Sequence, residues 1–99
     1  MGLKTITSCI GYQQITSLSA ATNLTVPARD PNGLSQEPTF ALIVAETQAV
    51  RWRDDGTNPT TTVGMPLAVG VPLQYDGDLS KIKFIEQTAG GVLNISYYA

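Results

Sequence analysis

The chain has 99 residues, of which 14% are charged and 42% hydrophobic, and its formal net charge is −2. A chain of this length holds one domain, residues 1–99. It has no histidine and a single cysteine, Cys9, which excludes a disulfide framework and the His-dependent catalytic and zinc sites. Its few basic residues are scattered among acidic ones, and no stretch of about 18 apolar residues occurs. We therefore expect no catalytic residues, no metal or other cofactor, and no binding to nucleic acid or membrane.

The first half of the chain predicts short strands separated by turns. Runs at 3–7, 12–18 and 23–26 have strand character, and the Asp-Pro-Asn-Gly turn lies within a loop at 28–38. Residues 39–46 are almost continuously apolar, which predicts a strand buried on both faces. Residues 49–53 alternate, with Val50 and Trp52 on one face and Arg51 and Arg53 on the other. Residues 39–53 are therefore predicted to form a β-hairpin.

The second half continues the pattern with turns rich in Asp and Gly. Residues 60–75 are extended, but Pro66 and Pro72 restrict this segment to the edge of a sheet. Alternating runs at 81–87 and 92–98, joined by a turn at 88–91, predict a second hairpin. No window has the periodicity of a helix. The fold class expected is all-β: a two-sheet β-sandwich of about seven to nine short antiparallel strands, with a jelly roll as one candidate arrangement.

The cluster from Arg51 to Asp55 is the stretch most like a functional site, and three interpretations remain open. It forms a core strand followed by a turn, an interface, or a ligand site. Trp52 lies on the same face as Val50, which favours the first interpretation. Arg51 and Arg53 then lie away from the core and are the first candidates for contacts with other subunits. Tyr98 is a third, because one tyrosine of the terminal strand faces outward.

Several segments also resemble a known family. The segments are VRWRDDG (50–56), GMPL (64–67), the run 79–85 and LNISYY (93–98). Together they make residues 40–98 similar to small structural proteins of tailed bacteriophages and prophages. The resemblance implies a non-enzymatic virion protein, either capsid decoration or a head–tail accessory, assembled in the cytoplasm of the bacterial host. It also implies a homo-oligomer that docks to the major capsid protein or other virion proteins; a trimer would suit a capsid.

A second function, from a different class, is a carbohydrate-binding β-sandwich module. Trp52, Tyr75 or Tyr98 would then serve as a platform on which a sugar ring stacks. This alternative requires an aromatic ring that is exposed beside a groove, whereas a Trp52 that packs in the core argues against it.

Overall fold

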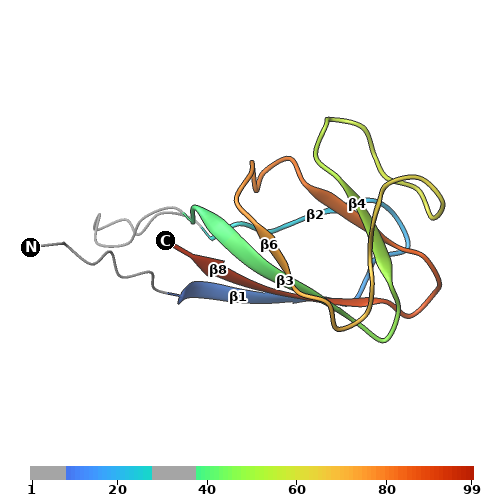
Figure 1. The fold of residues 1–99 in the computed structure, drawn as a ribbon, viewed down its shortest axis with the longest axis horizontal. Coiled ribbons are helices and arrows are strands. Elements are labelled where there is room, and N and C mark those ends of the chain that lie inside the picture. Colours follow the sequence, from blue (N-terminus) through green and yellow to red (C-terminus); the bar gives the residue numbers. More distant parts are fainter. Residues whose placement is uncertain (1–8, 28–37) are drawn as a thin grey trace, which may run out of the picture.

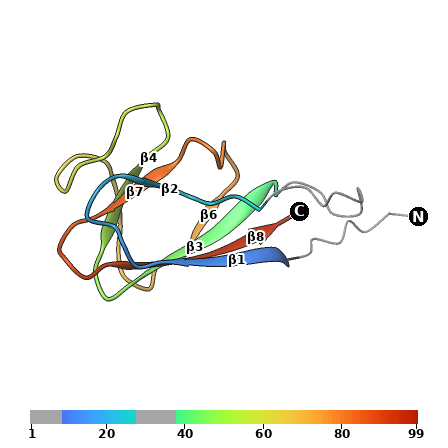
Figure 2. The same cartoon turned by 180° about the vertical axis from the view of Figure 1, so that it is seen from behind.

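The computed structural model describes residues 9–27 and 38–99, which form eight β-strands and no helix. The strands form two sheets, and these lie as two layers (Figures 1 and 2). Sheet A consists, in spatial order, of β1 (Cys9–Ile15), β8 (Val92–Tyr98), β3 (Phe40–Glu46) and β6 (Leu73–Tyr75). Sheet B consists of β2 (Thr22–Asn23), β7 (Lys83–Glu86), β4 (Val50–Arg53) and β5 (Met65–Leu67). The predicted all-β, two-sheet sandwich is confirmed.

The strand order makes this sandwich a jelly roll. Antiparallel ladders join β1 to β8, β2 to β7, β3 to β6 and β4 to β5, so the first four strands pair with the last four in reverse order. Ladders between β3 and β8 and between β4 and β7 complete the two sheets. Eight strands arranged in two sheets in this way define the jelly-roll architecture.

The core lies between the sheets and is formed mainly by alternate side chains of the strands, with Leu18, Leu24, Leu79 and Ile82 supplied by the connections. The faces predicted from alternation are correct, because Phe84 of β7 and Leu93, Ile95 and Tyr97 of β8 have no exposed surface. Burial of each large apolar side chain contributes about 1.5–3 kcal/mol relative to its exposure. The largest fully buried side chains are Leu18, Ile43, Val50, Ile82, Phe84, Leu93, Ile95 and Tyr97.

Both predicted hairpins are wrong, because the strands of each pair lie in different sheets. β3 belongs to sheet A and β4 to sheet B, while β7 belongs to sheet B and β8 to sheet A. Residues 47–49 and 87–91 are therefore arches, meaning connections that cross from one sheet to the other. Alternation shows that a strand has one buried face, but a hairpin and an arch produce the same alternation. The sequence pattern alone could not separate them.

The remaining strand predictions agree with the structure to within a few residues. The proline-containing segment 60–75 supplies β5 and β6, and each lies at the edge of its sheet as predicted. The strand predicted at 12–18 begins earlier, at Cys9, and ends at Ile15. The strand predicted at 3–7 and most of the loop predicted at 28–38 lie outside the described residues.

Candidate functional site

The loop from β4 to β5 folds back onto the strand from which it leaves. Arg51, on the outer side of β4, donates from Nε to the Thr61 carbonyl oxygen at 3.2 Å and from Nη1 to the Gly64 carbonyl oxygen at 2.9 Å. Lys83 Nζ on β7 donates to Asn58 Oδ1 in the same loop at 2.8 Å. These bonds hold the loop over the outer face of sheet B. The predicted interface residue Arg51 is thus engaged within its own chain.

Gly64 allows the loop to return so close to β4. A Cβ atom at this position would lie 3.1 Å from Arg51 Cβ and 3.2 Å from the Trp52 carbonyl oxygen. Its φ of 144° is also one that other residues rarely adopt. The Gly64–Met65–Pro66 segment is therefore explained by close packing against β4.

The charged residues after β4 form local contacts. Arg53 makes two hydrogen bonds to the carboxylate of Asp55, at 3.0 and 2.5 Å, and both side chains are partly exposed. The bond from Arg53 holds the pKa of the Asp55 carboxyl below its usual range. Asp54 Oδ2 accepts a 2.6 Å hydrogen bond from the Tyr75 hydroxyl. An exposed ion pair of this kind adds little stability. Of the two candidate arginines, Arg53 is therefore held less firmly within its own chain than Arg51.

The aromatic rings considered for sugar stacking do not form an open platform. Tyr75 is buried, and Trp52 packs against the core with its ring edge-on to Tyr75 at 5.9 Å. One face of the Tyr98 ring is covered by Phe40, since the two rings stack with centroids 5.0 Å apart and planes 11° from parallel. Trp52 is thus partly buried and packs against the core, on the face predicted from its alternation with Val50.

Tyr98 belongs to a second surface, the outer side of sheet A, which we call the sheet A face. Strand alternation and the register of the ladders place it opposite the buried row of Ile43, Ile95 and Tyr97. Glu46 is the one charged residue among its members. The sheet A face consists of Tyr12, Gln14, Phe40, Leu42, Val44, Glu46, Gln74, Val92, Asn94, Ser96 and Tyr98.

Asn94 organises the polar part of the sheet A face. Its Oδ1 accepts hydrogen bonds from the Tyr12 hydroxyl at 2.5 Å and from Gln14 Nε2 at 3.0 Å. Its Nδ2 donates to Glu46 Oε1 at 2.7 Å. The network ties together side chains from β1, β8 and β3, so it holds them in fixed positions on the sheet A face.

β3 carries apolar side chains on both of its faces. Ala41 and Ile43 are buried in the core, whereas Leu42 and Val44 are half-buried on the sheet A face. A strand of this kind is usual where both sides of a sheet are covered. The apolar run at 39–46 predicted a strand buried on both faces. The structure buries the inner face of β3 fully and its outer face only in part.

Four exposed apolar side chains occur between the end of the β4–β5 loop and the connection from β5 to β6, where Val69 pairs with Ala45 of β3. Val63, Met65, Val69 and Val71 are each about half exposed, at 52%, 56%, 49% and 51%, and we call these four residues the β5 strip. No Asp, Glu, Lys or Arg occurs between positions 55 and 76 of the sequence. Interface centres are typically depleted of charge and enriched in methionine and aromatic residues. The sheet A face has this character, whereas Val63 and Met65 of the β5 strip line a pocket of about 370 Å³ together with Arg53, Asp54 and Asp55.

A hollow of about 250 Å³ lies at the β6 side of the sheet A face. It is lined by Phe40, Gln74 and Asp76. The hollow combines one aromatic wall with an amide and a carboxylate, and its volume exceeds that of a single aliphatic side chain. It is thus a candidate receptor for a side chain of another molecule.

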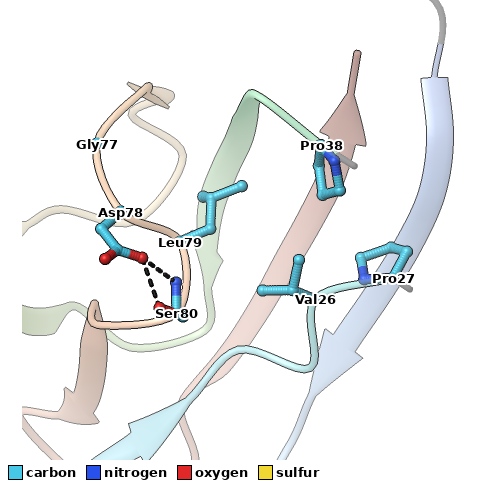
Figure 3. Close-up of a pocket in the computed structure, with 7 residues that line it drawn as sticks. All are labelled: Val26, Pro27, Pro38, Gly77, Asp78, Leu79 and Ser80. Carbon is cyan, nitrogen blue, oxygen red and sulfur yellow. Dashed lines mark hydrogen bonds between the residues drawn. The ribbon is translucent and has the colours of Figure 1, made fainter. Parts of the chain in front are cut away.

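Figure 3 shows a further pocket, of about 410 Å³, between the segment after β2, the start of β3 and the loop after β6. Its walls include Val26, Pro27, Pro38 and Leu79. Its one carboxylate, Asp78, accepts hydrogen bonds from the backbone N–H and the hydroxyl of Ser80 (Figure 3). These bonds hold the pKa of Asp78 below its usual range and close a turn. The lining residues include no second titratable group, so no acid–base pair is present in them.

Asp54 and Asp55 follow β4, and Asp76 and Asp78 follow β6; carboxylates gathered in loops of this kind can bind calcium. Within residues 9–27 and 38–99, no group of three Asp, Glu, Cys or His side chains is placed to hold a metal ion. The same part of the chain contains no helix able to cross a membrane.

Sequence reasoning selected Arg51, Arg53 and Tyr98, and the structure does not bring them together. Arg51 and Arg53 lie on sheet B, and Tyr98 lies on sheet A. The reasoning missed Asn94 and Met65, although signals for both exist: Asn94 alternates in phase with Tyr98, and Met65 lies within the uncharged run. The chain matches no protein-family model, no curated protein and no solved structure.

Proposed function

We propose that this protein is a non-enzymatic structural component of a bacteriophage particle, a capsid decoration or head–tail accessory protein. It would act by self-association and by docking to the major capsid protein or another virion protein. The observation that carries this proposal is the sheet A face, which is partly apolar and has Glu46 as its one charged member, together with the exposed apolar side chains of the β5 strip. Exposed apolar patches on a small domain mark sites of interaction with other proteins.

Two further considerations support the proposal. The segments 50–56, 64–67, 79–85 and 93–98 resemble structural proteins of tailed phages. The jelly roll also recurs in viral capsid proteins, although it occurs in lectins as well, so the architecture supports the proposal by analogy alone. The carbohydrate-binding alternative draws no support from Trp52 or Tyr75, because both rings are turned towards the core.

The proposal is tested on particles from the strain that carries the gene. Prophage induction should yield particles that retain the protein through density-gradient purification and that bind an antibody raised against it. A protein that stays at the top of the gradient and is missing from the purified particles would contradict the proposal. Addition of the purified protein to particles that lack it, followed by sedimentation, provides an independent measure of docking.

A further inference from the structure

The two sheets have four edges, and the edge strand β1 differs from the other three. β2 has two residues, β5 has three with Pro66 at their centre, and β6 has three that directly follow Pro72. Short strands and prolines are devices that keep sheet edges from pairing with other molecules. β1 has seven residues without proline or charge, and its bulge between Cys9 and Gly11 leaves residues 11–15 regular. Among the strands that the structure describes, β1 is therefore the edge that is open to pairing.

We propose that two copies of this chain pair through β1, antiparallel and around a two-fold axis. The two A sheets then form one sheet of eight strands. Figures 1 and 2 both show β1 along the outer border of its layer, and no strand within residues 9–27 and 38–99 pairs with it on the side away from β8. The inference rests on the proposed function, because it names the self-contact through which that function would operate.

The hydrogen bonds of sheet A show which backbone groups of β1 are free. The Gly70 N–H donates to the Ala45 carbonyl oxygen at 2.9 Å, so the backbone of Ala45 points away from β8. Successive residues of a strand direct their backbone groups to opposite neighbours. Counted along the unbroken registers of β3 with β8 and of β8 with β1, this places the odd-numbered residues of 11–15 in hydrogen bonds to β8. The N–H and C=O groups of Tyr12 and Gln14 therefore point to the free edge.

The side chains of Tyr12 and Gln14 leave this edge uncovered. Both lie on the sheet A face and donate hydrogen bonds to Asn94 Oδ1 on β8, at 2.5 and 3.0 Å, so both are drawn over β8 and away from the edge. On the inner side of β1, Gln13 Oε1 accepts a hydrogen bond from the Thr25 N–H at 3.0 Å. β1 is thus held in place from both sides, and a strand fixed in this way loses little conformational freedom when it pairs.

The chemistry of the edge selects an extended backbone as its partner, and β1 of a second copy fits it. The free groups of Tyr12 and Gln14 recur about 6.6 Å apart, twice the rise per residue of a strand, and a second copy presents the same groups at the same spacing. Antiparallel self-pairing sets a strand opposite its own sequence, so a charged strand would meet its own charge. β1 has no charged residue and therefore lacks this repulsion.

Self-pairing uses the free groups of both copies. With Tyr12 of one copy opposite Gln14 of the other, each of the two pairs exchanges two hydrogen bonds, so about four new bonds form around the axis. Such a contact is smaller than a typical specific interface, and we expect the dimer to form in the micromolar to millimolar range. Copies held side by side on a particle would pair more readily, because their effective concentration is high.

Hydrogen exchange followed by NMR tests the contact residue by residue. In the wild type, the amides of Tyr12 and Gln14 should exchange several-fold more slowly at about 1 mM protein than at about 20 μM, because pairing protects them. The amides of Gly11 and Gln13, which are bonded to β8 in either state, should change little. Equal exchange rates of Tyr12 and Gln14 at the two concentrations would overturn the inference.

Gln14→Pro and Gln14→Ala form a matched pair for a second test. Both lose the side-chain bond to Asn94, but only proline removes the outward N–H and places its ring at the edge. No hydrogen bond from β1 to β8 uses that N–H, so Q14P should keep the circular dichroism spectrum of Q14A. We expect Q14P to be a monomer by sedimentation velocity at concentrations at which Q14A and the wild type dimerise. Association of Q14P equal to that of Q14A contradicts the β1 contact.

The exchange measurement needs no variant, so it decides the inference even if Q14P fails to fold. It also separates the inference from the proposed function. A protein that is retained on particles but shows no protection at Tyr12 and Gln14 keeps the proposed function and loses the β1 contact. A protein that shows this protection but is missing from purified particles keeps the contact and loses the proposed function.

Discussion

Arg51 and Gly64 are joined by a hydrogen bond of 2.9 Å from the guanidinium to the backbone carbonyl oxygen, across thirteen residues of chain. The bond fixes the returning end of the β4–β5 loop, and a second bond from the same side chain, to Thr61, holds its middle. Arg51 therefore acts first as a structural residue. Its loss should alter the loop and, through Gly64, the start of the β5 strip.

Substitution of Arg51 should destabilise the fold, and the same change at Arg53 should not. Arg51→Ala removes two hydrogen bonds from a charged donor, which should lower the free energy of unfolding by about 1–3 kcal/mol. Arg53→Ala removes an exposed ion pair with Asp55 and should leave stability nearly unchanged. Urea unfolding followed by tryptophan fluorescence measures both. Equal losses for the two variants would show that the loop does not depend on Arg51.

Thr47 combines a strained backbone with a hydrogen bond between the two arches. Its φ is 68°, a left-handed value that is costly for a β-branched residue, and its hydroxyl lies 2.5 Å from the Gly90 carbonyl oxygen. Thr47→Ala loses the hydrogen bond and keeps a Cβ at positive φ, whereas Thr47→Gly loses the same bond and relieves the strain. We therefore expect T47G to be more stable than T47A by about 1 kcal/mol. Thermal unfolding of the pair measures this difference, and T47A matching or exceeding T47G would contradict it.

Tyr97 should make the stability fall at high pH. Its side chain is fully buried, and burial raises the pKa of the phenol to about 12, against about 10 in an unfolded chain. Between these values the unfolded state loses a proton that the folded state keeps, so stability is full below pH 10 and decreases as the pH rises towards 12. Burial and the hydrogen bond to Asp54 raise the pKa of Tyr75 as well, which adds a contribution of the same sign.

The variant Tyr97→Phe isolates the contribution of Tyr97. It loses the hydrogen bond from the hydroxyl to Gln13 Oε1, at 2.8 Å, and should be less stable at pH 8 by about 1 kcal/mol. Above pH 10, its free energy of unfolding should decrease less steeply than that of the wild type, by up to about 1.4 kcal/mol per pH unit. Urea titrations at pH 8, 10 and 11 give the two slopes. Parallel curves would exclude Tyr97 as a source of the pH dependence.

The strands could be predicted from the sequence because alternation is a local property. The run from Val92 to Tyr98 and the shared face of Val50 and Trp52 needed no tertiary information. The assignment of strands to sheets could not be predicted in this way. The turn after Glu46 could equally have returned the chain within sheet A, and it crosses to sheet B with Thr47 at positive φ.

The candidate site was less predictable than the fold because it depends on which outward residues become neighbours. Tyr12, Asn94 and Glu46 are far apart in the sequence and meet through the ladders from β1 to β8 and from β8 to β3. Arg51 was prominent in the sequence as a charge on an outward face. Its partners are backbone carbonyl groups, which a residue pattern does not reveal.

The mass of the wild-type protein in solution tests the central claim of self-association most directly. Sedimentation velocity from low micromolar to about 1 mM covers the affinities expected for a small interface. Self-association should produce a species at a whole-number multiple of 10.5 kDa whose fraction rises with concentration. A folded protein that stays at 10.5 kDa over the entire range would contradict it.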